Sequence, residues 1–102
     1  MASLKSPAQF THHQFEVIAG LFKMLGEPMR LRILQAVCKA PRSVNEIVEA
    51  TGSTQANVSK HLALLTTAGI LQRERDGQRV FYSVKEQLVV RLCEIVRAQW
   101  VD

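Results

Sequence analysis

Three polar side chains, Gln55, Ser59 and Lys60, recur at helical spacing and fall on one face of a single predicted helix. The opposite face of that helix holds three apolar residues and a histidine: Val58, Leu62, Leu65 and His61. Glutamine and serine both donate and accept hydrogen bonds, and lysine adds a positive charge. Such a face suits the base edges and phosphates of nucleic acid; for a helix taken alone, the alternative is an ordinary solvated face.

Two consecutive helices would hold that face in place. Ser43 and Glu46 form a capping box, which predicts a short helix that ends at Thr51-Gly52. Thr54 is the expected N-cap of the next helix, over residues 55–68, and is a candidate DNA contact itself. The pair is a helix-turn-helix, in which the first helix braces the second and the second enters the major groove.

A basic hairpin is expected directly after this pair. Beyond Gly69, the stop of the second helix, the apolar period changes from 3.6 to 2, which predicts strands over residues 71–75 and 78–84 around Asp76-Gly77. Its arginines can meet phosphates, and its tip lies where a minor groove would pass. The three candidate phosphate contacts are Arg73, Arg75 and Arg79.

The remaining helices carry more apolar surface than one small core can cover. The first is expected to open at Ser6-Pro7 and to run to about Leu25, the second to span residues 28–39, and the last to span residues 85–100. We therefore predict a mainly α fold with a small β-hairpin, a winged helix-turn-helix, that forms a homodimer through its first and last helices.

Composition limits the classes of function. The chain has 102 residues and a formal net charge of +4, which favours a polyanionic partner, here double-stranded DNA. Residues 1–6 are expected to be a flexible N-terminus, and residues 7–102 one DNA-binding and dimerisation domain. The N-terminus lacks the apolar core of a secretory signal and no apolar run could cross a bilayer, so a cytoplasmic protein without a membrane partner is expected. We find no nucleophile–base pair and no phosphate loop, and expect no enzyme, no catalytic residue and no cofactor.

Two cysteines, Cys38 and Cys93, occupy apolar helical positions, and neither belongs to a CxxC motif. One interpretation is a pair of small buried core residues. Another is a thiol sensor of oxidants, reactive sulfur or electrophiles, with Lys39 or Arg97 lowering a thiol pKa. A third is binding of a soft metalloid or metal ion.

Three stretches resemble the ArsR/SmtB family of bacterial winged helix-turn-helix repressors: LGEPMRLRILQAV, SVNEIVEATGSTQANVSKHLALLTTAGIL and RERDGQRVFYSV. The resemblance covers about residues 21–100. It implies a homodimer built from the first and last helices that represses by binding a palindromic operator and is released by an inducer. The positions that match the family's DNA contacts are Gln55, Ala56, Ser59 and Lys60 on the helix and Arg75, Gln78 and Arg79 on the wing. His61 matches the family's histidine, and its spacing predicts a packed, hydrogen-bonded side chain.

The chain departs from the metal-sensing members of this family. Ser43-Val44-Asn45 stands where those relatives often carry Cys-Val-Cys. The positions that match their last-helix zinc site are Glu86, Leu88, Gln99 and Asp102, a poor ligand set without histidine. No metal is therefore expected at either site. The resemblance also implies that disulfide-forming relatives use a cysteine nearer the end of the last helix than Cys93.

Two alternatives remain open at this point. A winged-helix module could bind protein instead of DNA, which would favour an acidic or apolar groove face. A repressor could also respond to a metal or metalloid through Cys38 and Cys93.

Overall fold

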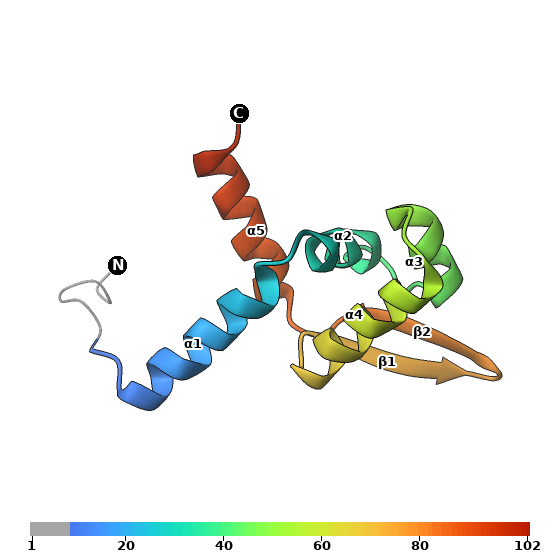
Figure 1. Cartoon of the computed structure of the whole chain (residues 1–102), viewed down its shortest axis with the longest axis horizontal. Helices are drawn as coiled ribbons and strands as arrows, with labels where there is room; N and C mark the ends of the chain where they lie inside the picture. The colour runs from blue at the N-terminus through green and yellow to red at the C-terminus, as the bar shows by residue number, and fades with distance from the viewer. Residues whose placement is uncertain (1–8) are drawn as a thin grey trace.

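The computed structural model describes residues 9–102, which form five helices and one antiparallel two-stranded sheet (Figure 1). The elements are α1 His12–Leu25, α2 Pro28–Val37, α3 Val44–Thr51, α4 Gln55–Thr67, β1 Leu71–Asp76, β2 Arg79–Val84 and α5 Gln87–Trp100. This order confirms the predicted mainly helical winged helix-turn-helix. Residues 9–102 contain no helix with the length and apolarity that a bilayer crossing requires.

The core lies where α2, α3 and α4 meet the base of the hairpin. Its centre is formed by apolar side chains that are at most 1% exposed: Ile33, Val37, Ile47, Val58, Leu62, Leu65 and Leu71. Figure 1 shows these three helices gathered beside the hairpin, while α1 and α5 extend away from them in different directions. The core therefore fixes the helix-turn-helix against the wing and leaves the outer helices projecting.

The local signals at α3 and α4 work as predicted. The Ser43 hydroxyl accepts from the Glu46 backbone N–H at 3.2 Å, and the Glu46 carboxylate accepts from the Ser43 N–H at 2.9 Å. Gly52 ends α3 in the left-handed region, with a φ of 70°. The Thr54 hydroxyl accepts from the Asn57 N–H at 3.1 Å and caps α4. Two capped helices and a short turn thus set the direction of α4.

The start of α1 differs from the prediction. Ser6-Pro7, the expected start, and residues 1–6, the expected flexible segment, lie outside the described residues. Residues 9–11 are described and are not helical, so a helix continuous from residue 7 is wrong. A capping box at Thr11 and Gln14, with hydrogen bonds of 3.1 and 2.9 Å, starts the helix at His12 instead. Phe10 packs edge-on against Phe15, with ring centroids 5.5 Å apart. This contact is a hydrophobic staple, which fixes the direction in which the chain enters α1.

Two further helix ends also differ, because tertiary hydrogen bonds use the residues concerned. α2 stops at Val37 rather than at residue 39, since Arg42 must run extended to form a two-bond bridge with Tyr82 of β2 (N···O 2.9 and 2.8 Å). α5 begins at Gln87 rather than at residue 85, because Glu86 is its N-cap in an extended conformation and Lys85 lies in the bend after β2, where its N–H donates to the Ile70 carbonyl at 2.9 Å.

The hairpin turn lies one residue later than predicted. Asp76 pairs with Arg79 as the last rung of the ladder, so the two loop residues are Gly77 and Gln78, not Asp76-Gly77. Gly77 has a φ of +67°, and no residue other than glycine has a positive φ among residues 9–102. A positive φ at the first loop position is the type II′ pattern, in which glycine comes first.

The outer helices expose most of their apolar side chains. Leu25 is the buried residue of α1, and Val89 is the buried residue of α5. Phe22 on α1 is 55% exposed, and Ile95 and Trp100 on α5 are 60% and 85% exposed. Isolated surface hydrophobics are ordinary, but a concentration on two projecting helices indicates a surface that another molecule covers.

Candidate nucleic-acid interface

The outward face of α4 is free of the protein's own chain. Thr54, Gln55, Ala56, Ser59 and Lys60 are all exposed. The opposite face is held in the core by residues that are at most 5% exposed: Val58, His61, Leu62 and Leu65. The predicted polar surface is therefore displayed by a helix that cannot rotate without bringing its apolar face into water.

The N-terminus of α4 is also open to an anion. Its first turn contains no acidic residue, and its free backbone N–H groups carry the positive end of the helix dipole. The Asn57 amide donates to the Ser53 hydroxyl at 2.9 Å, which ties the turn before the helix to its first turn. The Thr54 hydroxyl accepts a backbone N–H and keeps its own proton free to donate. This end therefore presents donors of the kind that bind phosphate oxygens in other proteins.

The wing arginines do not share one face of the hairpin. Arg73 pairs with Tyr82 and Arg75 with Val80, and alternation puts both arginines on the face of Leu71, which packs into the core. Arg79 lies opposite Asp76 on the other face. Each of the three is exposed. The structure thus brings Arg73 and Arg75 together and separates Arg79 from them.

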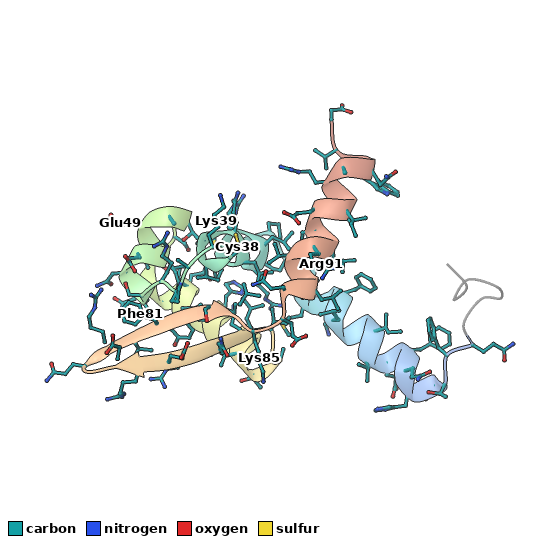
Figure 2. All side chains as sticks on the ribbon, turned by 180° about the vertical axis from the view of Figure 1, so that it is seen from behind. Cys38, Lys39, Glu49, Phe81, Lys85 and Arg91 are labelled. Atoms are coloured by element: carbon teal, nitrogen blue, oxygen red, sulfur yellow. The ribbon has the colours of Figure 1, made fainter. Side chains whose placement is uncertain are left out.

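Arg79 is ordered by its neighbours on the outer face. Its guanidinium carbon lies 4.9 Å from the centre of the Phe81 ring, a cation–π contact. Gln78 follows Gly77 in the turn at the tip of the wing. Figure 2, which labels Phe81, shows the tip of the hairpin extending past the helices, and residues 76–79 at this tip are exposed.

Arg42 is an interface candidate that sequence reasoning missed. Its backbone is pinned to β2 by the bridge with Tyr82, and its side chain is exposed just before the N-terminus of α3. The hydrogen bond from the Ser43 backbone, with the charges of Arg42 and Arg79, lowers the pKa of Glu46. Arg42 and Arg79 therefore lie on the same side of α3. A basic residue directly before the capping box was the available signal.

His61 is packed and hydrogen-bonded, as predicted. It is 5% exposed, accepts from Arg30 Nε at 3.2 Å through Nδ1, and faces Glu27 Oε2 at 3.1 Å through Nε2. His61 points away from the polar face of α4. It therefore holds α4 in place and is not part of the exposed face.

Cys38 and Cys93 line one cavity of about 560 Å³ between α2 and α5. Both thiols are free and half-buried. The walls are completed by Leu31, Leu34, Gln35, Lys39, Val90, Glu94 and Arg97. The Cys38 Sγ donates to the Gln35 carbonyl at 3.2 Å, and burial raises the pKa of the Cys93 thiol. Cys38 is the C-cap of α2 and Lys39 follows it, and Figure 2 labels both at this end of the helix.

The cavity joins residues that no local pattern connects. Each cysteine alone is a half-buried residue, Cys38 at the end of α2 and Cys93 within α5, and only the packing of the two elements places both at one cavity. Within residues 9–102, no group of three or more His, Cys, Asp or Glu side chains is arranged to hold a metal ion.

Comparison with known proteins agrees with this geometry. The sequence model described as "Bacterial regulatory protein, arsR family" matches residues 27–73. The "Probable mercury resistance operon repressor" of Streptomyces lividans is 34% identical over 87 residues, 85% of this chain and 70% of the relative. The crystal structure of Mycobacterium tuberculosis Rv0081 superposes with a TM-score of 0.77 at 30% identity, over 86% of this chain and 89% of that one.

A solution structure adds a related assembly. The homodimeric winged helix-turn-helix DNA-binding domain of Mb0332 from Mycobacterium bovis superposes with a TM-score of 0.78 at 25% identity, over 95% of this chain and 94% of that one. These relatives are regulators and not enzymes. A capped helix-turn-helix, a basic wing and these matches over most of its length lead to one assignment: the chain belongs to the arsR family of bacterial regulatory proteins.

Proposed function

We propose that the chain is a homodimeric transcriptional repressor, which binds a palindromic operator through α4 and the wing and releases it when an inducer reaches the cavity of Cys38 and Cys93. The observation that carries the proposal is the exposed polar face of α4, clamped by a buried opposite face. A repressor of this kind acts on DNA in the cytoplasm.

Base recognition falls to the N-terminal half of α4. Gln55 and Ser59 offer donors and acceptors to base edges, Ala56 offers a methyl group to a thymine methyl, and Thr54 and Lys60 bind phosphates. In the wing, Arg73, Arg75 and Arg79 bind backbone phosphates, and Gln78 reaches the minor groove from the tip. This division makes α4 the source of specificity and the wing mainly a source of affinity.

A second copy is the occupant we assign to the exposed apolar faces of α1 and α5. The homodimeric Mb0332 domain, which has the same fold, supports this assignment. A twofold axis would put two α4 helices on one side of a duplex, about 34 Å apart, the length of one helical turn of DNA. That spacing is why the operator is expected to be palindromic.

The inducer is assigned to thiol chemistry because the two cysteines share one cavity. Burial raises the pKa of Cys93, the opposite of the lowering by Lys39 or Arg97 that a thiol sensor was expected to show, so the proposal of an oxidant, reactive sulfur species or electrophile rests on the shared cavity alone. A second candidate is a soft metal ion bound by both thiolates. The name of the Streptomyces relative, a mercury resistance operon repressor, supports that candidate.

Binding to the protein's own promoter region tests the first half of the proposal. We expect a retarded complex at about 100 mM salt that survives excess random DNA. A folded dimer that binds no promoter fragment under these conditions would instead favour a protein-binding winged-helix module.

Release of that complex tests the second half. We expect peroxide, polysulfide or a soft metal ion to release wild-type protein, and Cys38→Ser or Cys93→Ser to abolish the response while keeping DNA binding. Release of the double Cys38→Ser/Cys93→Ser variant by the same inducer would refute the thiol mechanism. Mercury and arsenite, tested beside peroxide, separate metal binding from oxidation.

A further inference from the structure

A buried polar network ties α4 to the first two helices. His61 is the one buried polar residue among residues 9–102. Arg30 Nε donates to its Nδ1 at 3.2 Å, and its Nε2 faces Glu27 Oε2 at 3.1 Å. Because a guanidinium only donates, Nδ1 must accept, and the ring proton on Nε2 points at the Glu27 carboxylate. Both ring nitrogens are engaged, and a single ring orientation satisfies both partners.

The partners of His61 belong to the corner between α1 and α2. Glu27 is the N-cap of α2: its Oε1 accepts from the Met29 N–H at 2.9 Å, which leaves Oε2 for His61. Arg30 directs Nη1 at Met24, 3.4 Å from the carbonyl oxygen and 3.2 Å from the sulfur. Met24 lies in the last turn of α1. A continuous set of contacts therefore runs from α1 through Arg30 to α4.

The apolar contacts of α1 within one chain are confined to its last turns, where Leu25 is buried and Leu21 and Met24 pack partly against the core. Its last turn lies beside α4, because Met24 lines a groove together with Lys60 and Leu64. Figure 1 shows α1 leaving the molecule from this corner, with the rest of the helix projecting. The polar network is thus placed between the helix assigned to the dimer and the helix assigned to DNA.

We propose that Glu27, Arg30 and His61 are positioning residues that set the angle between α1 and α4, and thereby the spacing of the two recognition helices in the dimer. The inference rests on the proposed function, because this spacing matters only when two half-sites are read at once. Hydrogen bonds are directional and fix one setting, whereas an apolar contact of similar volume permits sliding. None of the three residues contacts DNA in this account.

Substitutions that keep volume but remove polarity test the network. We expect His61→Leu and Arg30→Met to stay folded and dimeric, and to lower the ratio of operator to random-DNA affinity about tenfold. His61→Gln should restore the ratio, since its amide can accept from Arg30 and donate to Glu27. Leu62→Met, a buried neighbour without a polar partner, is the matched control and should leave the ratio unchanged.

A purely structural role would lower stability and weaken binding to both DNAs alike. An unchanged ratio in a folded His61→Leu dimer and in Arg30→Met therefore overturns the proposal. Arg30 is only partly buried, so Arg30→Met keeps the test decisive should His61→Leu not fold.

Distance measurements test the same network without DNA. Spin labels at Glu16→Cys and Ala63→Cys, both exposed positions, report the separation of α1 and α4 in a Cys38→Ser/Cys93→Ser background diluted with unlabelled chain. We expect His61→Leu to broaden the distance distribution and His61→Gln to leave it narrow. An unchanged distribution in His61→Leu overturns the proposal. A wild-type chain that binds no operator refutes the proposed function instead, and the distances still report on the network.

Discussion

At the scale of single residues, Gln55 and Ser59 are the proposed source of base recognition, as distinct from simple charge attraction. Both are exposed in the first half of α4, and neither has a charge that could bind DNA of any sequence. A side chain that hydrogen-bonds a base edge contributes only when the correct base is present. In the proposed repressor, we therefore expect Gln55 and Ser59 to contribute specificity, and the arginines and Lys60 to contribute mainly affinity.

Replacing Gln55 and Ser59 by alanine tests this division. We expect each substitution to weaken operator binding by about 1–3 kcal/mol, because it removes hydrogen bonds to a base edge, and to leave random-DNA binding nearly unchanged. Titrations of labelled operator and scrambled duplex by fluorescence anisotropy measure both quantities. Gln72→Ala, which removes an exposed amide from β1, is the matched control. Unchanged operator affinity in the Gln55 and Ser59 variants would contradict their assigned role.

Arg79 and Arg42 should behave differently, because each is expected to bind a phosphate. Arg79→Gln and Arg42→Gln should each weaken operator and random DNA alike and flatten the salt dependence by about one phosphate contact. Arg91→Gln removes the same charge from α5, which Figure 2 shows apart from the wing, and should leave the slope unchanged. Affinities measured from about 50 to 200 mM salt give the slopes. A weakening confined to the operator would argue for base contacts instead.

At the scale of elements, local chemistry decided which predictions were right. The capping box at Ser43 and the cap at Thr54 act between residues three apart, so sequence alone locates α3 and α4. Once α4 is located, its helical period also predicts which of its residues are exposed. The start of α1 was wrong because two local starts compete, and the Thr11 box with its Phe10–Phe15 staple is the one used by the described residues.

Long-range contacts explain what the sequence could not predict. The bridge between Arg42 and Tyr82 shortens α2 and fixes the Arg42 backbone to β2, yet its partners are far apart along the chain. The shared cavity of Cys38 and Cys93 depends on the crossing of two helices, and so does the network of His61. Such contacts are properties of packing, which periodicity and capping do not encode.

The turn of the wing gives a test at this scale. Gly77→Ala must place a side chain at a φ of +67°, which we expect to cost about 1 kcal/mol of unfolding free energy. Gln78→Ala in the same turn has no positive φ to maintain and should change stability by less than about 0.5 kcal/mol. Thermal or urea unfolding measures both. Equal stability of the Gly77 variant and the wild type would show that the turn does not need a glycine.

At the scale of the whole molecule, rigid and projecting parts are segregated. α2, α3, α4 and the hairpin share one core, whereas α1 and α5 leave it with their apolar side chains exposed (Figure 1). A DNA-reading unit built this way can be moved as one body by the helices that carry it. The Cys38–Cys93 cavity lies between α2 and the middle of α5, where a change in one helix would reach the other.

A charge on the exposed apolar stripe of α5 tests the assembly that this arrangement needs. Ile95 is 60% exposed in the single chain, so Ile95→Glu leaves the protomer fold intact, because the carboxylate stays in water. In a dimer that covers this stripe, the same carboxylate is buried without a partner, which costs several kcal/mol and favours monomers. We expect sedimentation to show a folded monomer whose operator affinity falls at least a hundredfold, to that of a single half-site. Gln87→Glu adds the same charge at the polar start of α5 and should remain dimeric. If Ile95→Glu sediments as the wild type does, this stripe is not the dimer surface, and the two recognition helices are not paired through α5.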